Sequence, residues 1–212
     1  MEEKLQKVAE DFLKRIQEKL PAEKADKPSI VGIVGMIGSG KTTFCRELVK
    51  HLKGAVLVSS NSARYLLKQE GMSWGDNVRE STFYVAKELI KEGYAVVFDG
   101  DHVDKQKREN TQRIVDELGI RFYLVRINIL QQTAEKRIDA EDYNSHKQGF
   151  EDFWPDVDAE DAKNNLRVRI SLYLEIDREE PKPEFFAEIE NEGTIEEFKQ
   201  KAIEVAKKIE SQ

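Results

Sequence analysis

Gly35-Met36-Ile37-Gly38-Ser39-Gly40-Lys41-Thr42 decides the fold of this chain, because it fills every required position of the Walker A phosphate loop. Before it, residues 29–34 (Ser-Ile-Val-Gly-Ile-Val) are rich in β-branched side chains and predict a short buried strand. After it, Phe44, Leu48 and Leu52 recur at four-residue spacing and predict a helix from 43 to 52. A phosphate-binding loop needs a strand, a glycine-rich turn and a helix in this order.

This loop predicts a site for a nucleoside triphosphate, against the alternative of a glycine-rich turn that binds nothing. Glycines let consecutive backbone N–H groups converge on phosphate oxygens, and the helix N-terminus adds a favourable partial charge. Lys41 is expected to reach the β- and γ-phosphates, and Thr42 to place its hydroxyl on Mg²⁺. No guanine-specifying Asn-Lys-x-Asp string is present, which favours ATP. The residues expected to hold the nucleotide are Gly35, Gly38, Ser39, Gly40, Lys41, Thr42 and Thr43.

The composition limits what the chain can be. Its 212 residues are 35% charged and 39% hydrophobic, which suits one α/β domain with an insertion. The net charge of −7 argues against broad, sequence-blind nucleic-acid binding but leaves room for a local basic groove. Because the sequence has no apolar run near 18 residues and no secretory signal, we expect no membrane association and a cytoplasmic location. The single cysteine, Cys45, is interpreted as a packing residue.

Hydrophobic patterns alternate between strand and helix along the chain. Residues 1–28 predict an amphipathic helix and a polar linker, and residues 29–212 predict one domain. Strands are expected at 29–34, 55–59, 94–99, 120–128 and 185–190. Further helices are expected at 77–91, at 105–118, from 133, from 166 and from a capping box at 194–197. This pattern predicts an α/β fold with a five-stranded parallel sheet, helices on both faces, and ligands at the carboxyl ends of the strands.

The segment from about 140 to 165 breaks the alternation. It is polar and acidic, and it contains Phe150, Phe153 and Trp154, which look exposed. An excursion of this length between two strands is typical of a mobile lid. An acidic surface insertion is the alternative interpretation.

A second group of candidate residues follows the third expected strand. Asp99 comes after a run of apolar residues, which is the setting of a Walker B carboxylate. There it would bind Mg²⁺, directly or through water, or accept a proton from a substrate hydroxyl. Asp101 and His102 come next, so two carboxylates are expected at the mouth of the sheet. His102 alone is at least as well interpreted as a surface histidine.

The phosphate loop, a short second strand with a polar turn, and a third strand ending in Asp99 resemble the P-loop kinases of small substrates. Within that group the chain is most similar, over residues 29–137, to the 5′-kinase domain of polynucleotide kinase and its zeta-toxin-like relatives. The segment Phe98-Asp99-Gly100-Asp101, with Lys107-Arg108 behind it, carries the second part of this resemblance. The resemblance implies ATP and Mg²⁺ as cofactors and a small-molecule or nucleic-acid-end acceptor.

The chain departs from this family at the turn after the second strand. Where the family has an aspartate taken as the general base, this chain has Asn61, three residues before Arg64. An asparagine accepts no proton at neutral pH, so Asn61 would only orient a hydroxyl. Proton abstraction would then move to Asp99 or Asp101, or matter little because phosphoryl transfer depends on positioning and charge stabilisation.

A second departure concerns the lid. The family's lid helix presents two arginines four residues apart, and Arg137 matches the first of them, but Glu141 stands at the second position. The cation that closes on the transferring phosphoryl group would then be Arg137, or instead Arg167 or Arg169 beyond the insertion.

The acceptor is expected to contact residues that follow the second and third expected strands. Arg64 is suited to holding a phosphate through two hydrogen bonds, with a plain surface arginine as the alternative. Trp74, in a glycine-flanked loop, would stack a base or cover the acceptor, or else pack in the core. The basic run 105–108 is interpreted as a solvated helix face, with a nucleic-acid contact as the alternative.

These features together predict an ATP-dependent phosphotransferase, with Lys41, Asp99, Asp101, Arg137 and Arg167 as catalytic residues. Asn61, Arg64 and Trp74 would meet the substrate, and Thr42 and Asp99 the metal. Two alternatives stay open: a degenerate kinase in which ATP orders the 140–165 segment for a partner, and a plain NTPase.

Overall fold

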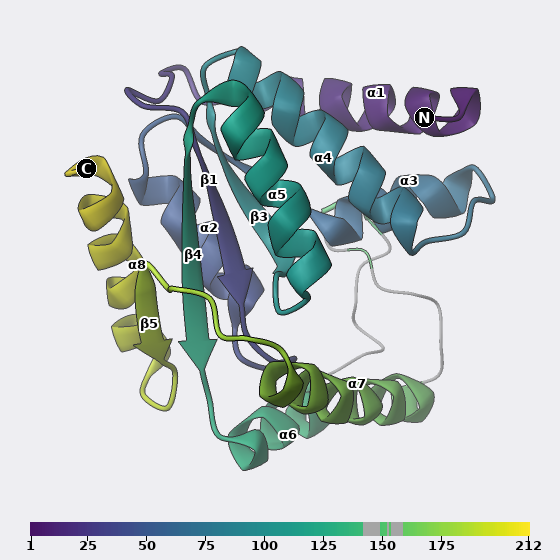
Figure 1. Ribbon diagram of the computed structural model, residues 1–212. Coiled ribbons are helices and arrows are strands. Elements are labelled where there is room, and N and C mark those ends of the chain that lie inside the picture. Colours follow the sequence, from purple (N-terminus) through teal and green to yellow (C-terminus); the bar gives the residue numbers. More distant parts are fainter. Residues whose placement is uncertain (142–148, 152, 154–158) are drawn as a thin grey trace.

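The computed structural model describes residues 1–141, 149–151, 153 and 159–212 (Figure 1). Its strands are β1 (Ser29–Val34), β2 (Ala55–Ser59), β3 (Ala95–Asp101), β4 (Arg121–Asn128) and β5 (Ala187–Glu190). Its helices are α1 (Glu3–Gln17), α2 (Lys41–His51), α3 (Ser60–Gln69), α4 (Asp76–Lys91), α5 (Lys105–Leu118), α6 (Gln131–Ala140), α7 (Ala159–Glu179) and α8 (Ile195–Glu210).

The strands form one parallel sheet in the order β2-β3-β1-β4-β5 (Figure 1). β1 lies at its centre, where Val31 is opposite Val97 of β3 and Tyr123 of β4. β1 is buried along its whole length, as expected for a β-branched strand covered on both faces. The predicted five-stranded parallel α/β fold is confirmed, with strand ends shifted by one or two residues.

Side chains that alternate along the strands face two helical layers (Figure 1). On one face, Ile30 and Val96 pack with α1, α3, α4 and α5. On the other face, Val31 and Val97 pack with α2 and α8, and the buried Cys45 belongs to this cluster, as its interpretation as a packing residue requires. Because all five strands are parallel, the loops at their carboxyl ends lie at the same edge of the sheet.

A third cluster closes that edge. Val34 and Met36, at the end of β1, pack against Ala134 of α6 and Ile170 of α7. α7 crosses the carboxyl ends of the strands (Figure 1), which brings residues 159–179 next to the phosphate loop.

The aromatic residues expected to be exposed in the 140–165 segment are not exposed where the structure describes them. Phe153 is buried, and its ring meets Tyr65 and Trp74 edge-on. Phe150 is half-buried and contacts Phe12 of α1. The expectation of exposed rings was wrong because helices of the domain itself supply the partners. Trp154 lies outside the described residues, as does most of the predicted lid (142–148, 152 and 154–158).

The N-terminal helix α1 lies against α3 and α4 (Figure 1). Its buried side chains, Leu5, Val8, Phe12 and Ile16, follow the predicted three- and four-residue spacing. In the part of the chain that the structure describes, no helix has both the length and the apolar character needed to cross a membrane.

Candidate active site

The phosphate loop connects β1 to α2 in a conformation that only glycine tolerates. Gly38 and Gly40 have φ angles of 81° and 90°. A Cβ on Gly40 would lie 2.8 Å from the side-chain nitrogen of Asn191, and one on Gly38 would lie 2.8 Å from the carbonyl oxygen of Ala134. The loop is therefore pressed against α6 and the end of β5, with its N–H groups at the start of α2.

Lys41 folds back over this loop. Its Nζ donates hydrogen bonds to the carbonyl oxygens of Gly35 and of Met36, the latter at 2.9 Å. The same nitrogen lies 3.5 Å from Oδ2 of Asp101. The ammonium group is thus held above the loop, at the position where a bound phosphate would meet it.

Thr42 and Asp99 form the second pair of the site. The Thr42 hydroxyl donates to Oδ1 of Asp99 at 3.0 Å, and the Ser59 hydroxyl donates to Oδ2 at 3.4 Å. Asp99 is 9% exposed, and burial raises its pKa, partly offset by the Thr42 hydroxyl and by Lys41. Two hard oxygen atoms beside a phosphate loop fit Mg²⁺, which takes few protein ligands and completes its shell with water and phosphate. Thr42 and Asp99 are the residues that would hold it.

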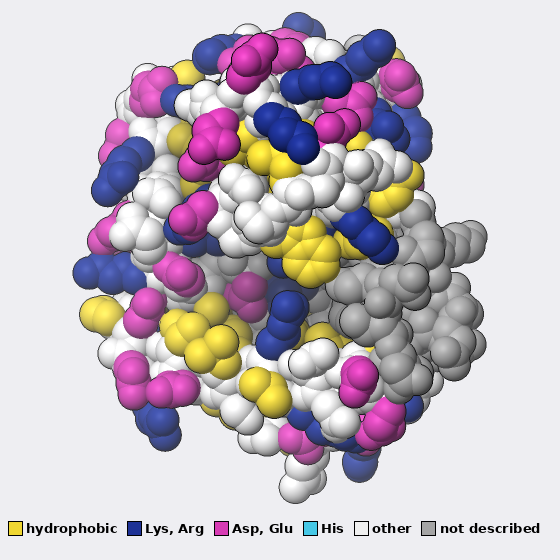
Figure 2. All heavy atoms as spheres, turned by 90° about the vertical axis from the view of Figure 1, so that its right-hand side faces the viewer, with side chains coloured by type: hydrophobic (Ala, Val, Ile, Leu, Met, Phe, Trp, Pro, Cys, Tyr) yellow, Lys and Arg dark blue, Asp and Glu magenta, His cyan; other side chains and the backbone are white. Residues whose placement is uncertain are grey.

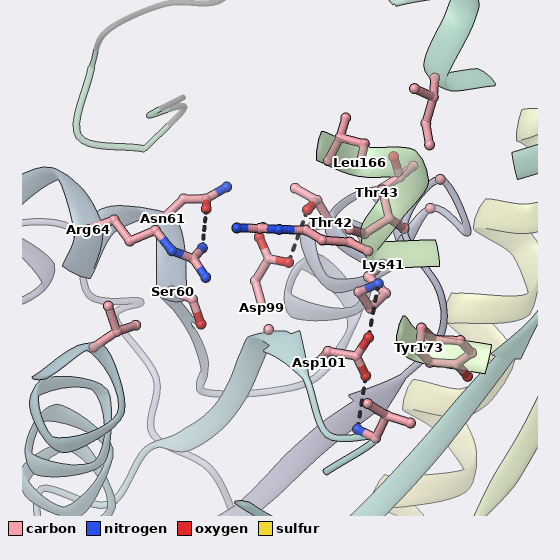
Figure 3. A pocket seen from close by; sticks show the side chains of 18 of the residues that line it. Lys41, Thr42, Thr43, Ser60, Asn61, Arg64, Asp99, Asp101, Leu166 and Tyr173 are labelled. Carbon is pink, nitrogen blue, oxygen red and sulfur yellow. Dashed lines mark hydrogen bonds and ion pairs between the residues drawn. The ribbon is translucent and has the colours of Figure 1, made fainter. Parts of the chain in front are cut away.

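Asp101 is fixed beside them by the backbone. Its Oδ1 accepts from the backbone N–H of Val103 at 2.9 Å, while Oδ2 faces Lys41. Its carbonyl oxygen accepts from Nζ of Lys107 at 2.8 Å. Figure 3 shows Asp101 close to Lys41, and Asp99 between Thr42 on one side and Asn61 and Arg64 on the other.

Lys107 corrects the interpretation of residues 105–108 as a solvated face. It lines the pocket, and burial lowers its pKa to about 8. Lys107 stands in the first turn of α5, directly after the strand that carries Asp99 and Asp101, so its side chain turns back to the strand end. This position at the start of the helix after β3 could have indicated a pocket residue from the sequence. The basic composition of residues 105–108 suggested a solvated face instead. Arg108, by contrast, pairs with Glu180 at 3.0 Å.

Asn61 and Arg64 lie together at the N-terminal end of α3. Nη1 of Arg64 donates to Oδ1 of Asn61 at 2.7 Å, and the backbone N–H of Asn61 donates to the capping hydroxyl of Ser59. Burial lowers the pKa of Arg64, and so does the charge of Arg169. The guanidinium group of Arg64 thus lines the pocket, and its hydrogen-bond partner is the uncharged amide of Asn61.

Arg137 reaches the phosphate loop from α6. Its guanidinium donates to the carbonyl oxygens of Gly38 at 3.2 Å and of Asn191 at 3.0 Å. Asn191 was missed in the sequence. It is 5% exposed, directly follows β5, and donates from Nδ2 to the carbonyl oxygen of Ser39 at 2.8 Å. Its place at the carboxyl end of a strand was the only available signal.

Arg167 does not reach the pocket. Its guanidinium pairs with Asp139 at 2.5 Å and lies 3.8 Å from Glu160. Two residues on, Arg169 lines the pocket instead. Residues two apart on a helix point in directions that differ by about 200°, so only one of the two arginines left open by the sequence faces the site.

His102 is not a surface residue. It is fully buried between the rings of Phe98 and Phe122, with Nδ1 3.1 Å from the carbonyl oxygen of Gly100. Burial lowers its pKa well below the usual value, so the ring is neutral. The expectation failed because β3 continues to Asp101 and carries His102 into the core, where its backbone N–H bonds to Ile33.

Except for Arg167 and His102, the candidate catalytic and substrate-binding side chains described above line one cavity of about 1300 Å³, more than a single nucleotide-sized ligand requires. Figure 2 shows the hollow, with acidic and basic side chains inside it and hydrophobic side chains at its rim. One half is lined by the phosphate loop, Arg137 and Asn191. The other half is lined by residues of α3, α4, α5 and α7, among them Asn61 and Arg64, and by Trp74 of the loop between α3 and α4. Trp74 is half-buried and meets the ring of Phe153 edge-on.

An AAA domain family model matches residues 30–151, more than half of the chain. The chain belongs to this AAA domain family. No curated protein sequence matches it.

Solved structures with this fold include several small-substrate kinases. APS kinase from Mycobacterium tuberculosis, in complex with AMPPNP and APS, is 16% identical with a TM-score of 0.56, over 85% of this chain and 98% of that one. A gluconokinase from Sinorhizobium meliloti 1021 is 14% identical with a TM-score of 0.52, over 89% and 95%. The tunicamycin resistance protein of Deinococcus radiodurans is 18% identical with a TM-score of 0.52, over 86% and 96%. These likenesses establish a P-loop kinase-like fold, and the narrower resemblance to polynucleotide kinase and zeta toxin stays a prediction.

Proposed function

We propose that this chain is an ATP-dependent phosphotransferase that moves the γ-phosphoryl group to a hydroxyl or phosphate of a nucleotide, a nucleic-acid end or a similar small substrate. One observation carries the proposal. A single cavity joins a complete phosphate loop and the Thr42–Asp99 pair to a second half with its own polar side chains, Asn61 and Arg64. A plain NTPase needs no such second half.

Each residue has a role that follows from its position. Lys41 and the backbone from Gly38 to Thr43 bind the triphosphate, and Arg137 adds charge beside the loop. Mg²⁺, held by Thr42 and Asp99, would neutralise charge on the phosphates. Asp101 or Asp99 accepts the proton of the acceptor hydroxyl, since Asn61 only orients it.

The proposal is tested by incubating the protein with γ-labelled ATP, Mg²⁺ and acceptors. The acceptors are nucleosides, nucleoside monophosphates, DNA and RNA with 5′-hydroxyl ends, and a metabolite extract. The Lys41→Met variant accompanies each reaction. Label on one acceptor, absent with the variant, supports phosphotransfer. Label released only to water identifies an NTPase.

Asn61 supports one alternative, a degenerate kinase that binds ATP and signals to a partner, because it replaces a group able to accept a proton. This alternative predicts tight ATP binding with no movement of label to any acceptor or to water. The intact Lys41, Thr42 and Asp99 favour catalysis, because positioning and charge stabilisation dominate phosphoryl transfer.

A further inference from the structure

Three cations from three separate helices line the side of the cavity that α3, α5 and α7 form. Arg64 comes from α3, Lys107 from α5 and Arg169 from α7, and all three line the cavity. Burial is the main cause that lowers the pKa of Arg64 and of Lys107. The charge of Arg169 lowers the pKa of Arg64 further, and the charge of Arg64 that of Lys107, while Asp99 and Asp101 respectively act in the opposite sense. Like charges gathered in this way repel one another unless an anion lies between them.

Within the described residues, none of these three cations forms an ion pair with a carboxylate. Arg64 donates to the amide oxygen of Asn61, and Lys107 to the backbone carbonyl of Asp101. Their sequence neighbours behave differently: Arg108 pairs with Glu180, and Arg167 with Asp139. Arg108 and Arg167, which lie outside the cavity, therefore have carboxylate partners, whereas Lys107 and Arg169, which line it, form no ion pair within the described residues.

We propose that this second half binds an anionic group of the acceptor, a phosphate, sulfate or carboxylate, among Arg64, Lys107 and Arg169. The inference rests on the proposed function, since it names the class of acceptor. Guanidinium groups match such oxyanions through paired N–H donors, and Lys107 adds a point charge. In Figure 3, Asp99 lies between Arg64 and Thr42, so the reacting hydroxyl would face this carboxylate while the anionic group is held on the Arg64 side.

A neutral acceptor such as an unmodified nucleoside or sugar is correspondingly a poor substrate. It would leave the three cations unpaired in a confined site, where uncompensated charge is costly. Anionic small molecules and the ends of oligonucleotides share the required chemistry, and the experiment below separates them.

The first arm measures anion binding with the phosphate loop blocked. The protein is saturated with Mg²⁺ and a non-hydrolysable ATP analogue, and inorganic phosphate or sulfate is then titrated by calorimetry. Arg169→Gln and Lys107→Met are each expected to weaken phosphate binding about ten-fold, as loss of one charge-assisted hydrogen bond does. The matched control is Arg167→Gln, because Arg167 is on the same helix as Arg169 but outside the cavity. This variant is expected to bind phosphate as the wild type does.

The second arm measures phosphoryl transfer to paired acceptors that differ only in an anionic group, such as a nucleoside and its monophosphate, and to a short oligonucleotide with a 5′-hydroxyl. The proposal expects the anionic member to be preferred, with a KM that rises in Arg169→Gln while the KM for ATP does not. Efficient transfer to the neutral member, unaffected by Arg169→Gln, would overturn it. So would phosphate binding that is equal in the wild type, Arg169→Gln and Lys107→Met.

The two arms fail independently. If no acceptor receives label but phosphate binding still depends on Arg169 and Lys107, the anion site stands and the proposed phosphotransfer fails. If transfer occurs without dependence on these residues, the phosphotransfer stands and the anion site fails. Preference for the oligonucleotide over the monophosphate identifies the source of the anionic group and supports the site.

Discussion

The two halves of the cavity differ in how their cations are stabilised. In the phosphate-loop half, the chain itself supplies partners: Lys41 bonds to two backbone carbonyls and faces Asp101, and Arg137 bonds to the carbonyls of Gly38 and Asn191. In the other half, Arg64, Lys107 and Arg169 have no carboxylate partner among the described residues. The first half is organised before any ligand arrives. In the second, Asp99 and Asp101 balance Arg64 and Lys107 only without direct ion pairs, and an anionic ligand would contact the cations directly.

Removing the charge of Lys41 gives the largest expected effect. Lys41→Met should lower turnover by roughly 10³-fold, because a preorganised cation at the transferring phosphate is lost. Labelled-phosphate transfer measures the loss, and circular dichroism checks that the fold is kept. Phosphate binding in the second half should be unchanged, which would separate the halves. Full turnover in this variant would remove Lys41 from the site.

Asp99 lies between the two halves, and its replacement is expected to affect activity and stability in opposite directions. Asp99→Asn keeps an acceptor for the Thr42 hydroxyl but loses the charge that holds Mg²⁺, so turnover should fall roughly 10²-fold. Because burial raises the pKa of Asp99, the buried charge opposes folding at neutral pH, and the neutral variant should unfold at a higher temperature. Calorimetry without nucleotide measures this. A lower unfolding temperature would show that the carboxylate stabilises the fold instead.

The same comparison explains what the sequence could predict. The phosphate-loop half is encoded in the contiguous run 35–43, and Asp99 is marked by a strand of apolar residues before it, so local sequence predicts both. The second half comes from α3, α5 and α7, which meet only after folding. Choosing Arg169 over Arg167, or Lys107 as a pocket residue, requires knowing which side of each helix faces the sheet edge. On α7, Arg169 stands three residues after Leu166 and four before Tyr173, so periodicity places it beside the buried face, but only the fold shows that this face lies at the sheet edge.

Lys107 makes the second half sensitive to pH. Its pKa is lowered to about 8, so the ammonium is charged below that pH and neutral above it. The KM for an anionic acceptor is expected to rise as the pH passes through about 8, by about ten-fold for the loss of one charged contact. Lys107→Arg keeps its charge and should remove this rise, whereas the KM for ATP should show no such step.

The stability of the protein should respond to Lys107 in the opposite sense. In the unfolded chain Lys107 regains its usual pKa of 10.5, so between about 8 and 10.5 the unfolded state holds more protons than the folded state. The contribution of Lys107 to stability therefore rises with pH across this range. Urea unfolding of the wild type and Lys107→Met at several pH values measures the difference. A difference that stays constant with pH would contradict a buried lysine.

A smaller effect is expected from Asn191, which supports the phosphate loop without facing the acceptor. Asn191→Ala removes the hydrogen bond to the Ser39 carbonyl, and ATP affinity should fall about ten-fold as the loop loses this support. Titration of a fluorescent ATP analogue measures the change. Anion binding in the second half should not change, and an equal loss there would show that the two halves are coupled through the loop.

The smallest effect belongs to Arg167, which tests whether position on α7 matters more than residue type. Arg167→Gln breaks a partly exposed ion pair with Asp139, which should cost roughly 0.2–1 kcal/mol of stability. Because Arg167 lies outside the cavity, transfer and anion binding should equal those of the wild type, whereas Arg169→Gln should weaken both at similar stability. If the two variants lose activity alike, the charge of α7 as a whole attracts the acceptor. If only Arg169→Gln loses activity, the arginine of α7 that lines the cavity contacts the acceptor, and the arginine outside it does not.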